Sequence, residues 1–247
     1  MVDLRDHTDA RHMATLPWPG ASFKVRTKGL SKRKYHLHQV TCIGLTIYRY
    51  YNNIHPTLPI LPPESAALNR LTNCPAKLRE AFFLALECGV RSFAPVGLPP
   101  TDGVYGQLMH RTVEATDHAQ HQLNDVDSSR QLFNHLVYCQ ALAFLAFASD
   151  KAGPSGMGRS AEYIGRVAGR MSDLGLNDSK ILSNIRDQDI EAYEVARRLF
   201  WVVFILDRFH ASSMSKDLLL PLFCGSVSRD DNLALGEIGY HLARKCA

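Results

Sequence analysis

The sequence contains no apolar run long enough to cross a membrane. Hydrophobic residues make up 46% of the 247 residues. The longest uninterrupted apolar runs, residues 141–148 and 199–206, are far shorter than the roughly 18–20 residues of a spanning helix. Residues 1–20 contain three aspartates and no apolar centre, unlike a secretory signal. We therefore expect an intracellular protein that does not associate with membranes.

Closely spaced cysteine pairs are also missing. The six cysteines lie at positions 42, 74, 88, 139, 224 and 246 and include no Cys-x2-Cys pair, so the spacing typical of a zinc module is absent. In a chain without a secretory signal, such cysteines are expected to be reduced and mostly buried. We predict that this chain binds no metal and no cofactor.

One segment has the spacing of a phosphate-binding loop. Residues 153–160, from Gly153 to Ser160, fit Gly-x4-Gly-Lys-Ser/Thr except that Arg159 replaces the lysine. Asp207 follows an apolar run, as the magnesium-binding aspartate of a nucleotide hydrolase would. Such a loop must leave a buried strand, however, and the preceding residues have helical periodicity. A helix–helix connector is therefore the favoured interpretation, and a nucleotide-binding hydrolase is the alternative function.

Four potential metal ligands recur at helical spacing. They are His110, Glu114, His118 and His121. Imidazole and carboxylate groups on one helix face can bind a transition metal. The same segment carries several other polar residues, so we interpret it as a solvated helix face. No motif for nucleophilic catalysis is present, and we predict that the chain is not an enzyme.

Hydrophobic residues recur at helical spacing along most of the chain, and no alternating pattern typical of a strand occurs. The helices are predicted over residues 40–51, 64–72, 76–88, 105–123, 129–149, 160–174 and 187–210. Four prolines within residues 55–63 predict an extended segment, and Gly175 is predicted to end a helix in the left-handed conformation. The predicted fold class is all-α, an irregular multi-helix domain.

Charge is unevenly distributed along the chain. Residues 1–50 contain nine Lys or Arg against three Asp, a net charge of +6, whereas the rest carries −2. Residues 1–37 are predicted to be a flexible basic arm, in which Lys32, Arg33 and Lys34 are candidates for nuclear import or phosphate contact. A solvated linker is the alternative interpretation. Residues 38–247 are predicted to form the helical domain, whose slightly acidic balance suits nucleic acid poorly.

Four segments occur in the order found in one protein family. They are residues 50–61, with an aromatic–His-Pro sequence, residues 139–142, with Gln-Ala-Leu, residues 165–177, with two Gly-Arg pairs, and residues 194–208, which end in Asp-Arg. Together they resemble the middle regulatory region of fungal binuclear zinc-cluster transcription factors, across about residues 40–221. Residues 73–82 are further similar to the branch of sugar and glucose-transport regulators.

The resemblance implies an all-helical regulatory domain of a nuclear transcription factor. The family's six-cysteine zinc cluster is absent from these residues, as is the Gly-Arg-Pro that usually follows its Asp-Arg pair. We therefore expect a fragment truncated at its C-terminus, which reaches DNA and zinc only through a missing DNA-binding module. The expected partners are co-regulators, a small effector bound in an interhelical cavity, and a second copy of the chain. Carbon- or sugar-responsive genes are the expected targets.

The last of these segments supplies the candidate structural residues Arg198, Trp201, Asp207 and Arg208. The Asp207–Arg208 pair follows eight apolar residues, so we expect it to be partly buried, and buried charges persist mainly when they are paired. An ion-pair lock between helices is predicted. The predicted mechanism is conformational: binding of an effector or co-regulator shifts the packing of the last three predicted helices. A helical scaffold without a ligand is the remaining alternative.

Overall fold

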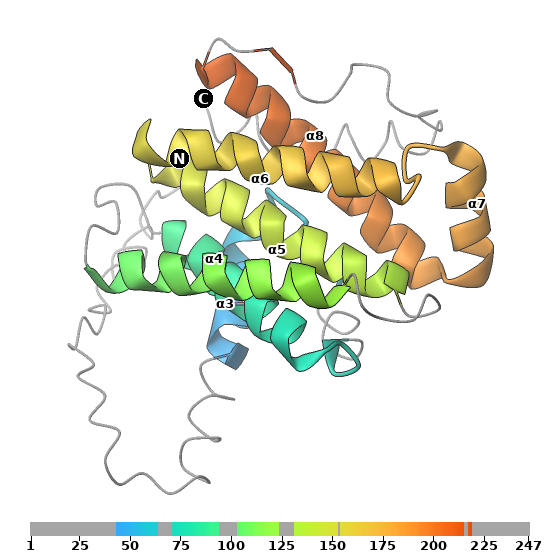
Figure 1. Ribbon diagram of the computed structural model, residues 1–247, viewed down its shortest axis with the longest axis horizontal. Helices are drawn as coiled ribbons and strands as arrows, with labels where there is room; N and C mark the ends of the chain where they lie inside the picture. The colour runs from blue at the N-terminus through green and yellow to red at the C-terminus, as the bar shows by residue number, and fades with distance from the viewer. Residues whose placement is uncertain are drawn as a thin grey trace, which may run out of the picture. The chain divides into compact units, whose positions relative to one another are not determined.

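The computed structural model describes residues 43–63, 71–93, 103–123, 131–152, 154–214 and 217–218. Within these ranges the chain forms helices and no strand, so the predicted all-α class is confirmed (Figure 1). The predicted basic arm, with Lys32, Arg33 and Lys34, lies outside the described residues. Most of the predicted helix 64–72 lies outside them as well.

The described helices follow one another along the chain. A helical stretch over residues 43–49 leads directly into the first labelled element. The labelled elements are the π-helix η1 (Tyr50–Ile54) and the α-helices α3 (Ala76–Ser92), α4 (Gly103–Leu123), α5 (Gln131–Lys151), α6 (Pro154–Asp173), α7 (Ser179–Gln188) and α8 (Ile190–Met214). The predicted helices 76–88, 105–123 and 129–149 therefore match α3, α4 and α5 to within a few residues.

Helix α5 forms the centre of the described structure. Every residue from 134 to 146 is buried, because α3, α4, α6 and α8 all pack against this helix. Figure 1 shows α5 running between α4 and α6, with α8 crossing behind α6. Alanines at positions 141, 143, 146 and 148 keep the surface of α5 narrow, which lets neighbouring helices approach closely. The predicted apolar stripe is thus extended to the whole circumference of the helix.

The same helix has the length and composition of a membrane span. Residues 132–151 have a mean hydropathy of 1.4, although their longest uninterrupted apolar run is much shorter. In this fold 83% of that window is buried inside the protein. A helix that is apolar all round is expected wherever protein surrounds it on every side.

The described cysteines are buried thiols. Cys74, Cys88 and Cys139 are buried and take part in no disulfide, as predicted. Burial raises the pKa of Cys88 and of Cys139 to about 12 each, because an apolar environment disfavours the thiolate. The other three cysteines lie outside the described ranges.

Gly175 ends α6 in the predicted conformation. Its φ is +66°, in the left-handed region. The Gly175 N–H donates to Ser172 O and the Leu176 N–H donates to Met171 O, both at 2.9 Å. This is the Schellman pattern, which satisfies carbonyls at the end of a helix. The side chains of Met171 and Leu176 are both buried, as the motif favours.

The predicted helix 187–210 matches α8 to within a few residues, but Asp189 separates α8 from α7, a helix that the sequence pattern did not predict. This residue has an extended backbone, with φ −152° and ψ 90°, and its carboxylate accepts the Ala192 N–H at 3.0 Å. An aspartate that caps the next helix interrupts the backbone hydrogen bonding of the one before it. Asp178 caps α7 in the same way, accepting the Lys180 N–H at 2.8 Å.

Residues 153–160 are mostly helical, contrary to both interpretations of the sequence. Helix α6 begins at Pro154, a residue type compatible with the first position of a helix. The preceding element is helix α5 rather than a strand, and Asp207 lies within helix α8. The phosphate-binding alternative therefore has neither the strand nor the loop that it requires. The connector is only two residues long, because α5 ends at Lys151.

Two glycines of this segment test its helical structure. A Cβ at Gly156 would collide with the carbonyl oxygen of Ser149, whereas a Cβ at Gly158 would meet nothing within 4 Å. We expect Gly156→Ala to lower the free energy of unfolding by about 1–3 kcal/mol, since backbone has to move. Gly158→Ala should raise it by about 0.5–1 kcal/mol, because alanine favours a helix interior.

Urea unfolding of the full chain, followed by circular dichroism, measures both changes. Equal effects of the two substitutions would contradict the close approach of α6 to the end of α5.

Candidate functional site

A cavity of about 150 Å³ lies where the proline-rich segment (residues 58–63) meets α3, α5 and α8. Most of its wall is apolar. The apolar lining includes Leu61, Pro62, Leu71, Phe82, Phe133 and Val195. Three of the four family-like segments contribute to this wall: residues 50–61, 139–142 and 194–208. A volume of this size can hold a molecule about as large as benzene.

The hydroxyl of Tyr50 fixes the proline-rich segment. It donates to Leu58 O at 3.1 Å and accepts the Leu61 N–H at 3.0 Å. Burial raises the pKa of Tyr50 well above its ordinary value, so the hydroxyl keeps its proton. The Nδ1 atom of His55 lies 3.2 Å from the same oxygen. Since the hydroxyl proton is given to Leu58, His55 must donate from Nδ1, which assigns the proton of the neutral ring to that nitrogen.

Other side chains bind two further carbonyls of this segment. Prolines cannot donate backbone hydrogen bonds and do not form helix or sheet ladders here, so the exposed backbone groups need partners elsewhere. The Tyr51 hydroxyl donates to Pro62 O at 2.5 Å, and the Gln140 side-chain amide donates to Ile60 O at 3.0 Å. The last bond joins residues 80 positions apart. It connects the first family-like segment to the second.

The turn η1 places Tyr50 and Tyr51 for these contacts. The helix predicted over residues 40–51 continues through Asn52 and Asn53 as a π-turn that ends at Ile54. Their side-chain amides donate to Tyr48 O and Arg49 O at 2.8 and 2.9 Å. Local bonds of this kind satisfy carbonyls that the wider turn leaves unpaired. Such π-turns often occur at functional sites.

The polar part of the cavity wall comes from α5 and from the first turns of α8. Gln140 is 3% exposed. Glu191 and Glu194 lie closer to solvent and complete the polar lining. Arg197 Nη2 lies 3.6 Å from Glu194 Oε2, and Arg198 Nε lies 4.0 Å from the same oxygen. The predicted spacing of Glu194 and Arg198, one helical turn apart, brings the two side chains together.

Of the four predicted structural residues, Arg198 lies nearest this cavity. Its charge contributes to the lowered pKa of His55, after the larger effect of burial. Trp201 is buried, and its ring meets those of Phe200 and Phe204 edge-on at 5.2 and 5.5 Å. Trp201 is not part of the cavity lining. These positions fit a packing role for the middle of α8.

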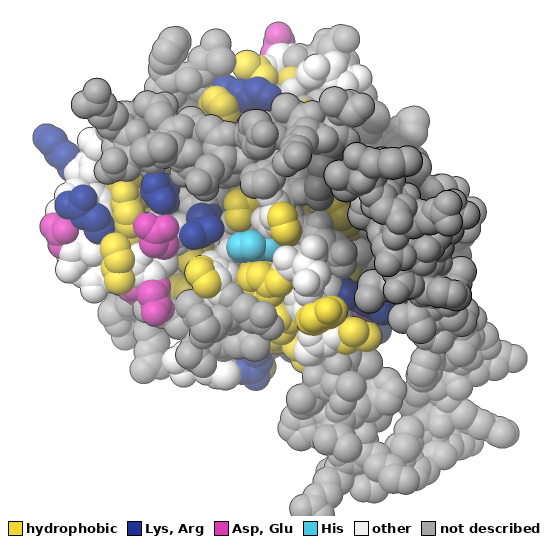
Figure 2. Space-filling view, turned by 180° about the vertical axis from the view of Figure 1, so that it is seen from behind, with side chains coloured by type: hydrophobic (Ala, Val, Ile, Leu, Met, Phe, Trp, Pro, Cys, Tyr) yellow, Lys and Arg dark blue, Asp and Glu magenta, His cyan; other side chains and the backbone are white. Residues whose placement is uncertain are grey.

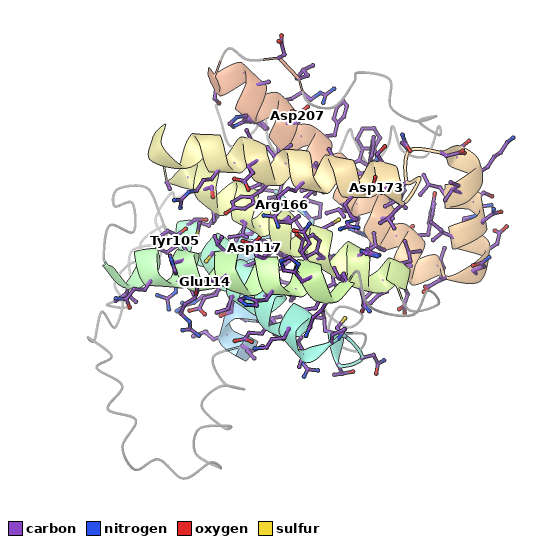
Figure 3. The ribbon with its side chains drawn as sticks, in the orientation of Figure 1. Tyr105, Glu114, Asp117, Arg166, Asp173 and Asp207 are labelled. Atoms are coloured by element: carbon purple, nitrogen blue, oxygen red, sulfur yellow. The ribbon has the colours of Figure 1, made fainter. Side chains whose placement is uncertain are left out.

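Asp207 and Arg208 form their ion pair within one helix. Asp207 is 1% exposed and accepts from Arg208 Nη1 at 2.8 Å. The Arg208 guanidinium also lies 3.5 Å from the centre of the Phe204 ring. The arginine thus lies beside Asp207 and over an aromatic face of its own helix, and the lock between helices stays a prediction. Figure 3 shows Asp207 on α8, well away from the other labelled acidic residues.

An interhelical connection exists instead at Arg166, in the third family-like segment. Its Nη2 lies within hydrogen-bonding distance of Asp117 Oδ1 (2.9 Å), Gln120 Oε1 (2.8 Å) and the Tyr138 hydroxyl (2.6 Å). Arg166 thus joins α6 to α4 and α5 (Figure 3). The sequence pattern gave no sign of this group, because its members are up to 49 positions apart. Its polar groups satisfy one another, which indicates a structural role.

The predicted His and Glu face lies on α4. His110 and Glu114 are exposed, with His110 Nδ1 3.5 Å from Glu114 Oε2. His118 Nδ1 lies 2.7 Å from the backbone oxygen of Glu114. Among the residues that the structure describes, no group of three or more His, Cys, Asp or Glu could hold a metal ion.

Two sequence comparisons bear on this chain. Residues 111–228 match the profile of the fungal specific transcription factor domain. Over 207 residues the chain is 31% identical to an uncharacterized transcriptional regulatory protein of Schizosaccharomyces pombe. This alignment covers 80% of the chain but only 23% of the relative's length. No solved structure matches the chain. The proline-rich segment and α3 precede the matched profile and pack against it.

The buried hydroxyl of Tyr50 can be removed without changing the ring. We expect Tyr50→Phe to lower the free energy of unfolding by about 1–3 kcal/mol, because it leaves the Leu61 N–H buried without a partner and removes one of the two hydrogen bonds to Leu58 O. Tyr48→Phe is the matched control, since the Tyr48 side chain is 62% exposed, and should change it by less than about 0.5 kcal/mol. Urea unfolding measures both. Similar effects of the two substitutions would contradict the role of Tyr50.

The stability of the fold should fall in mild acid. Burial lowers the pKa of His55 and of His135 below the ordinary value of 6.5, with smaller contributions from Arg198 and Arg170. The unfolded chain therefore takes up protons first, and the free energy of unfolding decreases as the pH falls below about 6.5. Unfolding at pH 7.5 and 5.5 should show this decrease, and a His55→Gln, His135→Gln double variant should show less of it. An unchanged pH dependence in the double variant would refute this assignment.

Proposed function

We propose that this chain, whose residues 111–228 match the fungal specific transcription factor domain, is the regulatory region of a nuclear transcription regulator. The observation that carries the proposal is the agreement between this match and a 207-residue alignment to a relative named as a transcriptional regulatory protein. The ordered series of four family-like segments supports it further. The chain spans 23% of the relative's length, so the activity of a whole regulator is part of the proposal.

In this proposal DNA binding belongs to a separate zinc-cluster module. The charge distribution supports this division of roles. The net charge of residues 51–247 is −2, while +6 is concentrated in residues 1–50, and phosphate contacts require a positive surface. Lys32, Arg33 and Lys34 are the candidates for nuclear import. Regulation of carbon- or sugar-responsive genes stays a prediction, since neither comparison names a regulated gene.

The proposed mechanism is a change in helix packing rather than catalysis. Helix α5 contacts α3, α4, α6 and α8, so a shift of α5 would change its packing against each of these helices. The cavity lies where α3, α5, α8 and the proline-rich segment meet. A small effector there, or a co-regulator on the helices around it, would favour whichever packing binds it better. The chain would act without forming or breaking bonds in a substrate.

A reporter gene tests this proposal. The full chain is fused to the DNA-binding domain of an unrelated regulator, and transcription from its target site is compared with that domain alone. We expect transcription to change several-fold, in either direction. Tyr50→Phe should alter this response, because it releases the segment that closes the cavity, while Tyr48→Phe should leave it unchanged.

The fusion must first be shown by immunoblotting and microscopy to be intact and nuclear. A nuclear, intact fusion that transcribes no differently from the DNA-binding domain alone would overturn the proposed regulatory role.

A further inference from the structure

We infer that the cavity beside the proline-rich segment binds a small primary amine, an apolar group of about the size of a benzene ring carrying one ammonium. This inference deepens the proposed function, since the amine would be the effector of the regulatory domain. It rests on the size of the cavity, on the chemistry of its polar wall and on the positions of the nearby charges.

The volume and lining determine the apolar part of the ligand. About 150 Å³ is half or less of the roughly 300–1,000 Å³ of pockets that hold drug-sized molecules. Phe82 and Phe133 offer aromatic surface, and Leu61, Leu71 and Val195 complete an apolar wall. Burial of a compact hydrocarbon group here removes apolar surface from water. A sugar, which exposes hydroxyl groups all round, would leave most of those groups without partners.

The polar wall consists of hydrogen-bond acceptors. The Gln140 amide nitrogen is committed to Ile60 O, which turns its carbonyl oxygen away from that contact and leaves it to accept. The other polar lining residues, Glu191 and Glu194, are carboxylates, which only accept when ionised. Among the lining residues that the structure describes there is no Lys, Arg or His. A ligand head group that donates several hydrogen bonds therefore fits, and an ammonium has three N–H groups.

The two nearby arginines leave part of Glu194 available. Both approach the same carboxylate oxygen, Oε2, at 3.6 and 4.0 Å, which is longer than a hydrogen bond. Within the described residues no hydrogen bond or ion pair to the second oxygen of Glu194 is present. A ligand ammonium at that oxygen would form a charge-assisted hydrogen bond. A ligand carboxylate would instead face two carboxylates of the same charge.

Binding at these groups would connect three parts of the fold. Gln140 belongs to α5, Glu194 belongs to α8, and the proline-rich segment is joined to Gln140 through Ile60. An ammonium between Gln140 and Glu194 would favour the packing in which α5 and the first turns of α8 lie close together. The ligand would thereby select one arrangement of the helices that the proposed mechanism invokes.

Three probes that share one ring test the head group. Benzylamine, benzyl alcohol and benzoate carry a cation, a neutral hydroxyl and an anion at neutral pH. Binding to the purified full chain is measured by isothermal titration calorimetry at pH 7 and low ionic strength. We expect benzylamine to bind about tenfold more tightly than benzyl alcohol, since a charged hydrogen bond contributes about 1.5 kcal/mol or more. Benzoate should not bind measurably.

Matched variants locate the site. Glu194→Gln and Glu191→Gln keep the size of the side chain and remove one charge each. We expect Glu194→Gln to weaken benzylamine about tenfold and to leave benzyl alcohol unchanged, with a smaller effect at Glu191. Glu80→Gln is the control, because Glu80 lies on α3, outside the cavity lining, and its side chain is 50% exposed. Equal urea midpoints for all variants show that each is folded.

The outcomes separate this inference from the proposed function. It is overturned if benzylamine fails to bind, if the three probes bind equally, or if neither Glu194→Gln nor Glu191→Gln changes the affinity. If the reporter fusion is active but benzylamine does not bind, only the inference of an amine ligand is overturned. If benzylamine binds selectively but an intact, nuclear fusion does not change transcription, only the proposed transcriptional role is overturned.

Discussion

The architecture around the cavity depends on how the backbone N–H and C=O groups of the proline-rich segment find hydrogen-bond partners. Residues 58–63 lie in no helix or sheet. Backbone hydrogen bonds satisfy the Leu58 and Ile60 N–H groups, and other carbonyl and amide groups have side-chain partners. The hydroxyl of Tyr50 satisfies two of them at once and is itself held by His55. Its ring packs edge-on against Phe144 of α5, with centres 5.5 Å apart. One aromatic residue thus ties the segment to the central helix by both polar and apolar contacts.

Helix α5 converts this local arrangement into a property of the whole helical assembly. Its buried surface carries the Gln140 contact at one site and the Tyr138 contact to Arg166 at another. These two polar contacts connect α5 with the proline-rich segment and with α4 and α6. The interior between these two contacts is closely packed and has little free space, so a small displacement at one contact is passed on to the other.

The side of the molecule opposite to that in Figure 1 presents a group of hydrophobic side chains at its centre (Figure 2).

Helical periodicity predicted the parts of the fold that depend on local sequence. It located α3, α4 and α5. The preference of glycine for the left-handed conformation predicted that α6 ends at Gly175. The sequence pattern did not predict that α6 begins at Pro154, because the Pro, Ser and Gly residues at the start of this helix are typical of a loop. The small size of Gly156 instead permits a close approach to Ser149. The interruption at Asp189 was also missed, since an aspartate can sit in the first turn of a helix as easily as it can cap one.

The candidate site was less predictable, because its contacts are long-range. The family-like segments contained Tyr50, Gln140 and Glu194, but nothing in their order indicated that they meet. Partners 80 positions apart leave no periodic pattern in a single sequence. The same reason hides the Arg166 group. The Asp207–Arg208 pair was expected to be partly buried, and Asp207 is buried, but no sequence pattern indicates that Arg208 lies over the Phe204 ring of its own helix.

The π-turn at Tyr50–Ile54 carries a consequence for how this region can vary during evolution. A π-turn has one more residue than the α-helical turn that it replaces. Because each residue of an α-helix rotates the chain by about 100°, deleting one residue here would swing the preceding helical stretch around its axis relative to the prolines. Substitutions could be tolerated at its exposed asparagines, whereas a change in the number of residues could not. The turn therefore constrains length more strictly than it constrains identity.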